Sequence, residues 1–179
     1  LLVDLDTYAR RLMDSPWVAG AALRRVLPGT IEVRIVERTP MAIARIHDRL
    51  YLVDEDGVVM DEFGPEYREF DLAVVDGLVG VQAGEPAQVD PSRAALTHQF
   101  LQALQGEALR QRVSQVDVSN ARDVVVLLDS DPTMVHLGDT RFLERLRTYE
   151  ELAPALQERL QEIDYVDMRF DERVYVKSK

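Results

Sequence analysis

Hydrophobic and charged positions alternate most clearly in one short stretch near the N-terminus. Ile31, Val33 and Ile35 are separated by single charged residues, which is the two-residue period of a strand with one buried and one solvated face. Pro28 and Gly29 stand just before this run and are typical of a type II turn, in which glycine supplies a positive φ. The pattern therefore predicts a hairpin whose covered face carries the three apolar side chains.

Local signals also mark the two ends of this N-terminal region. Asp4 and Asp6 are suited to cap a short helix that runs through Met13. Pro40 lacks a backbone N–H and forces Thr39 into extended geometry. We therefore expect a helix followed by the hairpin, with the second strand of the hairpin ending at Pro40.

Apolar runs separated by turn residues predict further strands. Most of these runs are short, and Gly, Pro, Asn and Asp punctuate them, as in sheets with tight connections. Asp56 followed by Gly57 is a hairpin-turn signal between two of the runs. The predicted strands cover residues 41–46, 50–53, 58–60, 72–75, 113–118, 124–128, 134–137, 165–170 and 174–177.

Two amphipathic helices are predicted in the second half of the chain. Asp90 followed by Pro91 is typical of an N-cap and the first helical position, and apolar residues then repeat every four positions through Leu104. A second helix is expected after Gly138, and Pro154 should kink it or split it in two. This order of elements predicts an α+β fold in which a mainly antiparallel sheet carries two helices on one side.

The composition narrows the classes of partner. The chain has 179 residues and a formal net charge of −11, so nucleic acid and anionic lipid surfaces would repel it. It has no cysteine, which excludes disulfides, thiol catalysis and zinc-thiolate sites. No apolar run approaches the ~20 residues that span a bilayer. Protein partners are therefore the favoured class.

The sequence offers little material for catalysis. His47, His98 and His136 are its only histidines, and no two of them stand at a metal-binding spacing. Residues 54–57 resemble the start of a calcium loop, but Val59 occupies the position that requires glycine. No nucleophile elbow, P-loop or dinucleotide fingerprint occurs. We predict no catalytic residue, metal or cofactor, although catalysis by paired carboxylates stays open at this point.

Five segments together resemble one family of bacterial proteins. Ser15–Ala44, SPWVAGAALRRVLPGTIEVRIVERTPMAIA, resembles the second half of the POTRA domain of the FtsQ/DivIB cell-division family. Four later segments are similar to motifs that follow in that family, namely YLVDEDGVVM at Tyr51–Met60, VVDGL at Val74–Leu78, VHLGD at Val135–Asp139 and YVDMRF at Tyr165–Phe170. The motifs occur in the family's order and cover nearly the whole chain.

The resemblance implies a domain organisation and a function. Residues 1–45 would be the C-terminal part of a POTRA domain, without its first strand, and residues 46–179 an FtsQ-type β domain. Because the chain starts at Leu1 without methionine, we expect it to be a fragment. The resemblance implies that the whole protein crosses the cytoplasmic membrane once, with this region on the extracytoplasmic side at the division septum. The implied role is a non-enzymatic divisome scaffold that binds small coiled-coil partners of FtsB and FtsL type, and other division proteins through the POTRA domain.

The resemblance also implies a docking site near the C-terminus. In the family the strand after the Asp-Leu-Arg-Tyr motif lies at the edge of the β domain, and the partner adds a strand to it. An edge strand that binds no partner is normally short, charged or covered, whereas the last predicted strand of this sequence is rich in apolar residues. The implied partner-binding residues are Arg169, Phe170, Glu172, Val174, Tyr175 and Val176. Arg173 and Ser178 depart from the family pattern, because glycine is common at the first position and tryptophan occurs at the second.

Two alternatives belong to other functional classes. A POTRA-type chaperone module of an outer-membrane assembly or secretion protein would show tandem POTRA repeats and then a β-barrel, and residues 47–179 show neither pattern. An extracytoplasmic hydrolase would use paired carboxylates, for which the sequence shows no recognisable constellation.

Overall fold

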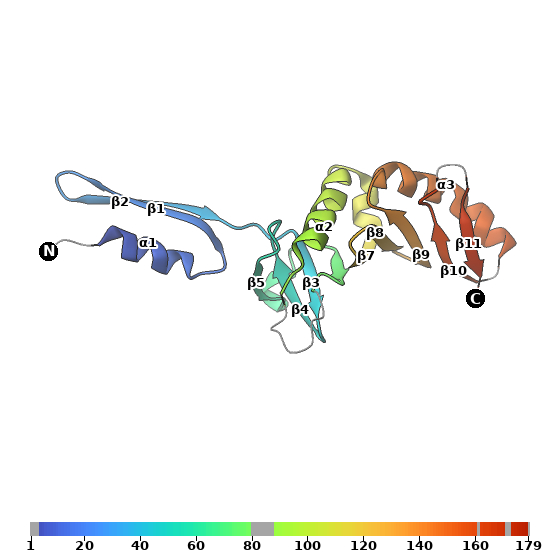
Figure 1. The fold of residues 1–179 in the computed structure, drawn as a ribbon, viewed down its shortest axis with the longest axis horizontal. Helices are drawn as coiled ribbons and strands as arrows, with labels where there is room; N and C mark the ends of the chain where they lie inside the picture. Colours follow the sequence, from blue (N-terminus) through green and yellow to red (C-terminus); the bar gives the residue numbers. More distant parts are fainter. Residues whose placement is uncertain (1–3, 80–87, 161, 171–172, 179) are drawn as a thin grey trace.

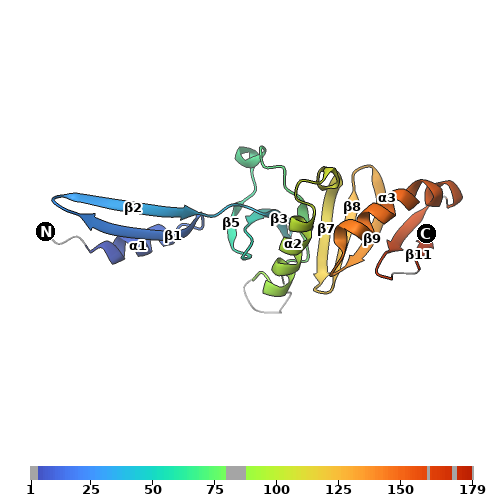
Figure 2. The same cartoon turned by 90° about the horizontal axis from the view of Figure 1, so that it is seen from above.

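A computed structural model describes residues 4–79, 88–160, 162–170 and 173–178. The described chain is elongated, with a small N-terminal unit at one end and a large sheet with its helices at the other (Figures 1 and 2). The small unit contains a helix and a two-stranded sheet, and the larger unit is built on a nine-stranded sheet. The fold is α+β, as predicted, with a small N-terminal unit followed by a mainly antiparallel β region.

The small unit consists of three elements with clear local causes. They are α1 (Leu5–Met13), β1 (Val18–Val26) and β2 (Thr30–Glu37). The carboxylate of Asp4 caps α1 by accepting the backbone N–H groups of Asp6 at 3.1 Å and Thr7 at 3.3 Å, which satisfies donors that have no partner inside the helix. Strands β1 and β2 pair antiparallel over almost their full length, so the predicted helix and hairpin are both confirmed.

Two predictions about this hairpin are wrong. Residues 27–29 connect the two strands, and Gly29 does not take the positive φ that a type II turn requires. Ile31, Val33 and Ile35 are 43%, 49% and 45% exposed, not buried. They share a face with the half-buried positions of β1, but α1 lies mainly against β1, so no second layer of the described residues covers β2.

The larger unit is one continuous sheet of short strands. Neighbours in space follow the order β11-β10-β9-β8-β7-β6-β3-β4-β5. Five pairings are antiparallel, and the pairings β3–β6, β6–β7 and β9–β10 are parallel. The strands are β3 (Ala42–Ile46), β4 (Arg49–Val53), β5 (Val59–Glu62), β6 (Val74–Asp76), β7 (Val113–Asn120), β8 (Asp123–Leu128), β9 (Asp131–Gly138), β10 (Ile163–Asp167) and β11 (Tyr175–Ser178).

A short connection leads the chain from the small sheet to the large sheet. Strand β2 ends at Glu37 in the small sheet, and β3 begins at Ala42 in the large one. The predicted end of the hairpin at Pro40 agrees with this change. The division into domains that we expected after residue 45 stays a prediction, and β3 already pairs within the large sheet before that point.

The parallel pairings explain why both helices lie on one side of the sheet. Helix α2 (Pro91–Ala103) connects β6 to β7, and α3 (Phe142–Arg159) connects β9 to β10. The four strands run in the same direction, and both crossovers move toward β11. Crossovers of one hand that move in one direction must cover the same face. Figure 2 shows both helices along that face.

The two helices begin and end by different local rules. Asp90 caps α2 by accepting the N–H groups of Ser92 at 2.8 Å and Arg93 at 3.2 Å, so the cap read from the sequence is confirmed. Arg141, with a φ of 56°, precedes α3 and makes no side-chain cap. The prediction that α3 starts directly after Gly138 is wrong, and Pro154 does not split this helix, which continues to Arg159 as one element.

Most of the apolar core lies between the helices and the sheet. Phe100 of α2 and Phe142 of α3 meet edge to face with ring centroids 5.5 Å apart, above fully buried positions such as Val116 of β7. Burying an apolar side chain of this size contributes about 1.5–3 kcal/mol. This layer holds the sheet in place beneath the two helices.

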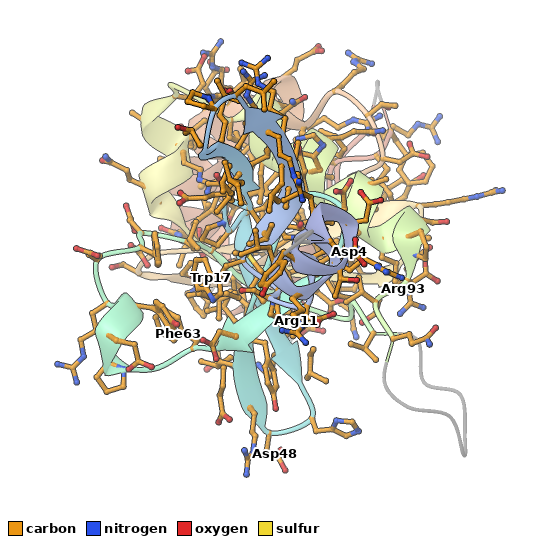
Figure 3. All side chains as sticks on the ribbon, turned by 90° about the vertical axis from the view of Figure 1, so that its left-hand side faces the viewer. Asp4, Arg11, Trp17, Asp48, Phe63 and Arg93 are labelled. Carbon is orange, nitrogen blue, oxygen red and sulfur yellow. The ribbon has the colours of Figure 1, made fainter. Side chains whose placement is uncertain are left out.

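A smaller apolar cluster joins the two units. Ile43 and Leu52 point to the other face of the sheet, where Phe63, Tyr67 and neighbouring residues of the 63–72 segment pack against them. Trp17 of the small unit joins this cluster, with its ring centroid 5.7 Å from that of Tyr67. Figure 3 views the molecule from the small unit and labels Trp17 and Phe63.

Candidate interaction surface

Strand β11 forms an open edge of the large sheet. Its residues pair antiparallel with β10, through Tyr175 opposite Asp167, Val176 opposite Val166 and Lys177 opposite Tyr165. No strand among the described residues pairs with the other side of β11. The backbone N–H and C=O groups on that side are therefore available to an added strand. Figure 1 shows β11 at the end of the molecule opposite the small unit.

The two faces of β11 have different environments. Val176 shares a face with the fully buried Val166 and packs against the main core. Tyr175 lies on the opposite face and is 49% exposed, and Phe170, which follows β10, is 51% exposed. Their rings meet edge to face with centroids 5.1 Å apart, a favourable geometry for aromatic pairs. Together with Val174, which is 37% exposed, they form what we call the edge patch (Phe170, Val174 and Tyr175).

The guanidinium of Arg169 lies next to the edge patch and is held by two carboxylates. Its Nε and Nη2 donate to the two oxygens of Asp167 at 2.8 and 2.5 Å, and its Nη1 donates to Oδ2 of Asp123 at 3.1 Å. The Asp167 and Asp123 side chains are 8% and 5% exposed, whereas the Arg169 side chain is 39% exposed. Such a buried carboxylate requires a cation or several hydrogen bonds.

These contacts change the acidity of both partners. Burial alone would raise the pKa of Asp167, but its hydrogen bonds with Arg169 and the charge of Arg169 together lower the pKa below its ordinary value. The hydrogen bonds that the Arg169 guanidinium donates to the Asp167 carboxylate raise the pKa of Arg169 above its already high ordinary value. Both groups are therefore charged in the folded protein at neutral pH.

Further hydrogen bonds connect this ion pair to three strands and a helix. Oδ1 of Asp123 accepts the N–H of Gly138 at 2.9 Å, and Oδ2 lies 2.8 Å from Nδ1 of His136. Nη2 of Arg145, from α3, donates to the carbonyl of Arg169 at 3.1 Å. The ends of β8, β9 and β10 are therefore joined by polar contacts at the place where the chain leaves the sheet.

The structure brings together most of the site residues expected from the sequence. Arg169, Phe170, Val174, Tyr175 and Val176 lie on or beside the β10–β11 edge. Strand β10 ends at Asp167, so the predicted extension of this strand through Phe170 is wrong. Strand β11 starts one residue later than expected, and the expected contact residue Glu172 lies outside the described residues.

Sequence reasoning missed Asp123 and His136. Asp123 is 46 residues away from Arg169 in the chain and stands beside a turn. A carboxylate at such a position usually only makes the surface soluble, so nothing in the sequence singled it out. Asp167 could have been identified from the sequence, because it belongs to the Tyr165–Phe170 motif. Within the described ranges, no group of three or more His, Cys, Asp or Glu side chains could hold a metal ion.

Comparison with known proteins identifies the class of protein first. The C-terminal model of the cell division protein FtsQ/DivIB matches residues 42–169, and the FtsQ-type POTRA domain matches residues 1–38. The chain is thus a bacterial cell-division protein with a POTRA-type domain. It belongs to the FtsQ/DivIB family, as the sequence motifs had indicated.

Individual relatives agree with this family. The chain is 32% identical over 176 residues to the cell division protein FtsQ of Koribacter versatilis, covering 96% of this chain and 50% of that protein. It is 27% identical over 177 residues to FtsQ of Syntrophotalea carbinolica, covering 98% of this chain and 62% of that protein. The chain therefore spans only about half to two thirds of the length of these relatives.

One solved structure is also similar. It is the major extracytoplasmic domain of the cell division protein DivIB from Geobacillus stearothermophilus, with 17% sequence identity, a TM-score of 0.42, and coverage of 70% of this chain and 98% of that chain. Among the residues that the present structure describes, no helix has the length and apolar character needed to cross a membrane.

Proposed function

We propose that this chain is the scaffold part of a divisome protein and that it binds small coiled-coil partners of FtsB and FtsL type by adding a partner strand to β11. The observation that carries the proposal is the open edge of β11 beside the half-exposed Phe170 and Tyr175. Membership of the FtsQ/DivIB family supports it. The proposed role involves no catalysis, cofactor or metal.

Strand addition suits this edge for physical reasons. Backbone hydrogen bonds to an added strand satisfy the open N–H and C=O groups and tolerate changes in side chains. Side chains then supply selectivity, and exposed aromatic residues next to such an edge are the usual energetic centre of an interface. We propose the partner-binding residues Arg169, Phe170, Glu172, Val174, Tyr175 and Val176.

Family membership also supports a proposal for the setting of this scaffold. We propose that residues 1–45 complete the end of a POTRA domain and that residues 46–179 form the β domain, both on the extracytoplasmic side of the cytoplasmic membrane at the septum. A membrane helix outside this chain would tether the protein there, and the POTRA part would contact other division proteins. Family membership favours this proposal over an outer-membrane assembly module and over a hydrolase.

The proposal can be tested by calorimetry with the extracytoplasmic segment of an FtsB-type protein from the same organism. Phe170→Ala removes an aromatic of the edge patch and should weaken binding roughly tenfold or more, since a central aromatic contact contributes on the order of 2 kcal/mol. The matched control is Val59→Ala on β5, the opposite edge of the same sheet, where Val59 is 37% exposed. Equal affinities of the folded Phe170→Ala variant and the wild type would place the docking surface elsewhere.

A further inference from the structure

The segment that carries Phe170 is not held by the strand ladder. Strand β10 ends at Asp167, and the last backbone bond to β9 is the one from Met168 N–H to the carbonyl of His136 at 2.9 Å. Beyond this point the described backbone of Arg169 is held by side chains: its N–H donates to Asp167 at 3.0 Å, and its carbonyl accepts Arg145 at 3.1 Å. The orientation of residues 169–170 therefore depends on polar side-chain contacts.

Asp123 holds this segment from the interior of the sheet. It begins β8, which is separated from β11 by two strands, and its side chain is 5% exposed. Its Oδ1 accepts a hydrogen bond from the N–H of Gly138. Its Oδ2 contacts Nδ1 of His136 and accepts a hydrogen bond from Nη1 of Arg169. A carboxylate fixed by two further groups is a rigid partner for a guanidinium, because its own position does not depend on the arginine.

Gly138 provides the space in which this contact forms. A Cβ atom there would stand 2.9 Å from Nη1 of Arg145 and 3.3 Å from Cγ of Arg169. The φ of Gly138 is +75°, a conformation that favours glycine. The two arginine side chains thus approach the end of β9 closely, and Arg169 can reach the carboxylate of Asp123.

The geometry points to Asp123 as a positioning residue for the docking edge. We propose that it fixes the guanidinium of Arg169, and through it the neighbouring Phe170, in the orientation that a partner strand meets. This inference rests on the proposed function. Arginine has five N–H groups, and three donate to Asp167 and Asp123. The two others, on the half-exposed side chain, can donate to a carbonyl or carboxylate oxygen of the partner.

A double-mutant cycle tests the proposal with the same FtsB-type segment. The variants are Asp123→Asn, Arg169→Lys and the pair together, where lysine keeps the charge but loses the planar fork. Asp123→Asn should weaken binding about fivefold to tenfold in the wild-type background, and should have no further effect once Arg169 is lysine. Equal losses in both backgrounds, or no loss in either, would overturn the proposal.

Two controls separate positioning from loss of stability. Thr133→Val alters a buried residue of β9 in the same sheet, 3% exposed, and should lower the melting temperature without changing affinity. If Asp123→Asn does not fold, Asp123→Glu enters the same cycle, since it keeps the charge and displaces the carboxylate by one methylene. Weaker binding of Phe170→Ala without coupling between Asp123 and Arg169 refutes only this inference, whereas unchanged binding of Phe170→Ala refutes the proposed function.

Discussion

Arg38 forms an ion pair with Asp54 across the junction between the small unit and the large sheet. The two side chains are 17% and 4% exposed, so solvent screens this pair far less than a surface pair. Asp54 also accepts the N–H groups of Asp56 at 3.1 Å and Val58 at 2.7 Å. The backbone N–H of Arg38 in turn donates to the carbonyl of Trp17 at 2.8 Å. Arg38 thus links the end of the hairpin to the β4–β5 turn.

Loss of this ion pair should loosen the junction. The chain has no cysteine, so spin labels can be placed at Leu27→Cys in the exposed hairpin tip and at Gln157→Cys on the exposed side of α3. Arg38→Ala should broaden the distance distribution between the labels, because it removes the ion pairs that link the end of the hairpin to the β4–β5 turn. Arg24→Ala is the matched control, since Arg24 pairs with Glu32 inside the hairpin. Equal widths in the two variants would contradict a role of Arg38 at the junction.

Gly77→Ala should destabilise the protein strongly. Gly77 has a φ of +79°, and a Cβ atom there would stand 2.4 Å from the backbone N of Ser119. A side chain in this backbone conformation costs on the order of 1–3 kcal/mol before any steric overlap is counted. Gly29→Ala is the control, since no atom other than those of Gly29 and its two chain neighbours lies within 4 Å of the Cβ position, and it should change stability by less than about 1 kcal/mol. Urea denaturation of both variants measures the difference, and similar midpoints would contradict the prediction.

Asp167 should contribute to stability at neutral pH and lose this contribution in acid. Its pKa is lower in the folded state than its ordinary value, so the unfolded chain binds a proton more readily. The stabilisation is therefore complete above the unfolded pKa of about 3.9 and declines as the pH falls below it, toward the folded pKa. The difference in urea midpoint between the wild type and Asp167→Asn should shrink from pH 7 to pH 3. A difference that stays constant over this range would exclude ionisation of Asp167 as its source.

The features that were predictable from the sequence are those with a local cause. The cap at Asp90 and the turn at Gly57 depend on a few neighbouring residues, and both occur as predicted. The exposure of Ile31 could not be read from the alternation, because a period of two defines a face and does not say whether another layer covers it. The contact between Arg169 and Asp123 joins residues 46 positions apart, and only the order of the strands brings them together.

The motif resemblance supplied what local patterns could not. Alternation alone predicted a strand near the C-terminus, but its position at the edge of the sheet depends on the order of all nine strands. The family motifs implied that edge position, and β11 occupies it. The contacts of the individual side chains with a partner stay a prediction.

Amide hydrogen exchange with and without the FtsB-type segment tests the central claim most directly. Successive backbone N–H groups of a strand point to opposite sides, so those of β11 that face away from β10 are open in the described structure. If a partner strand adds to β11, exchange should slow at every second residue between Tyr175 and Ser178 and should not change at β5, the opposite edge. Unchanged exchange in β11 on saturation with the partner, or protection at β5 instead, would contradict docking at this edge.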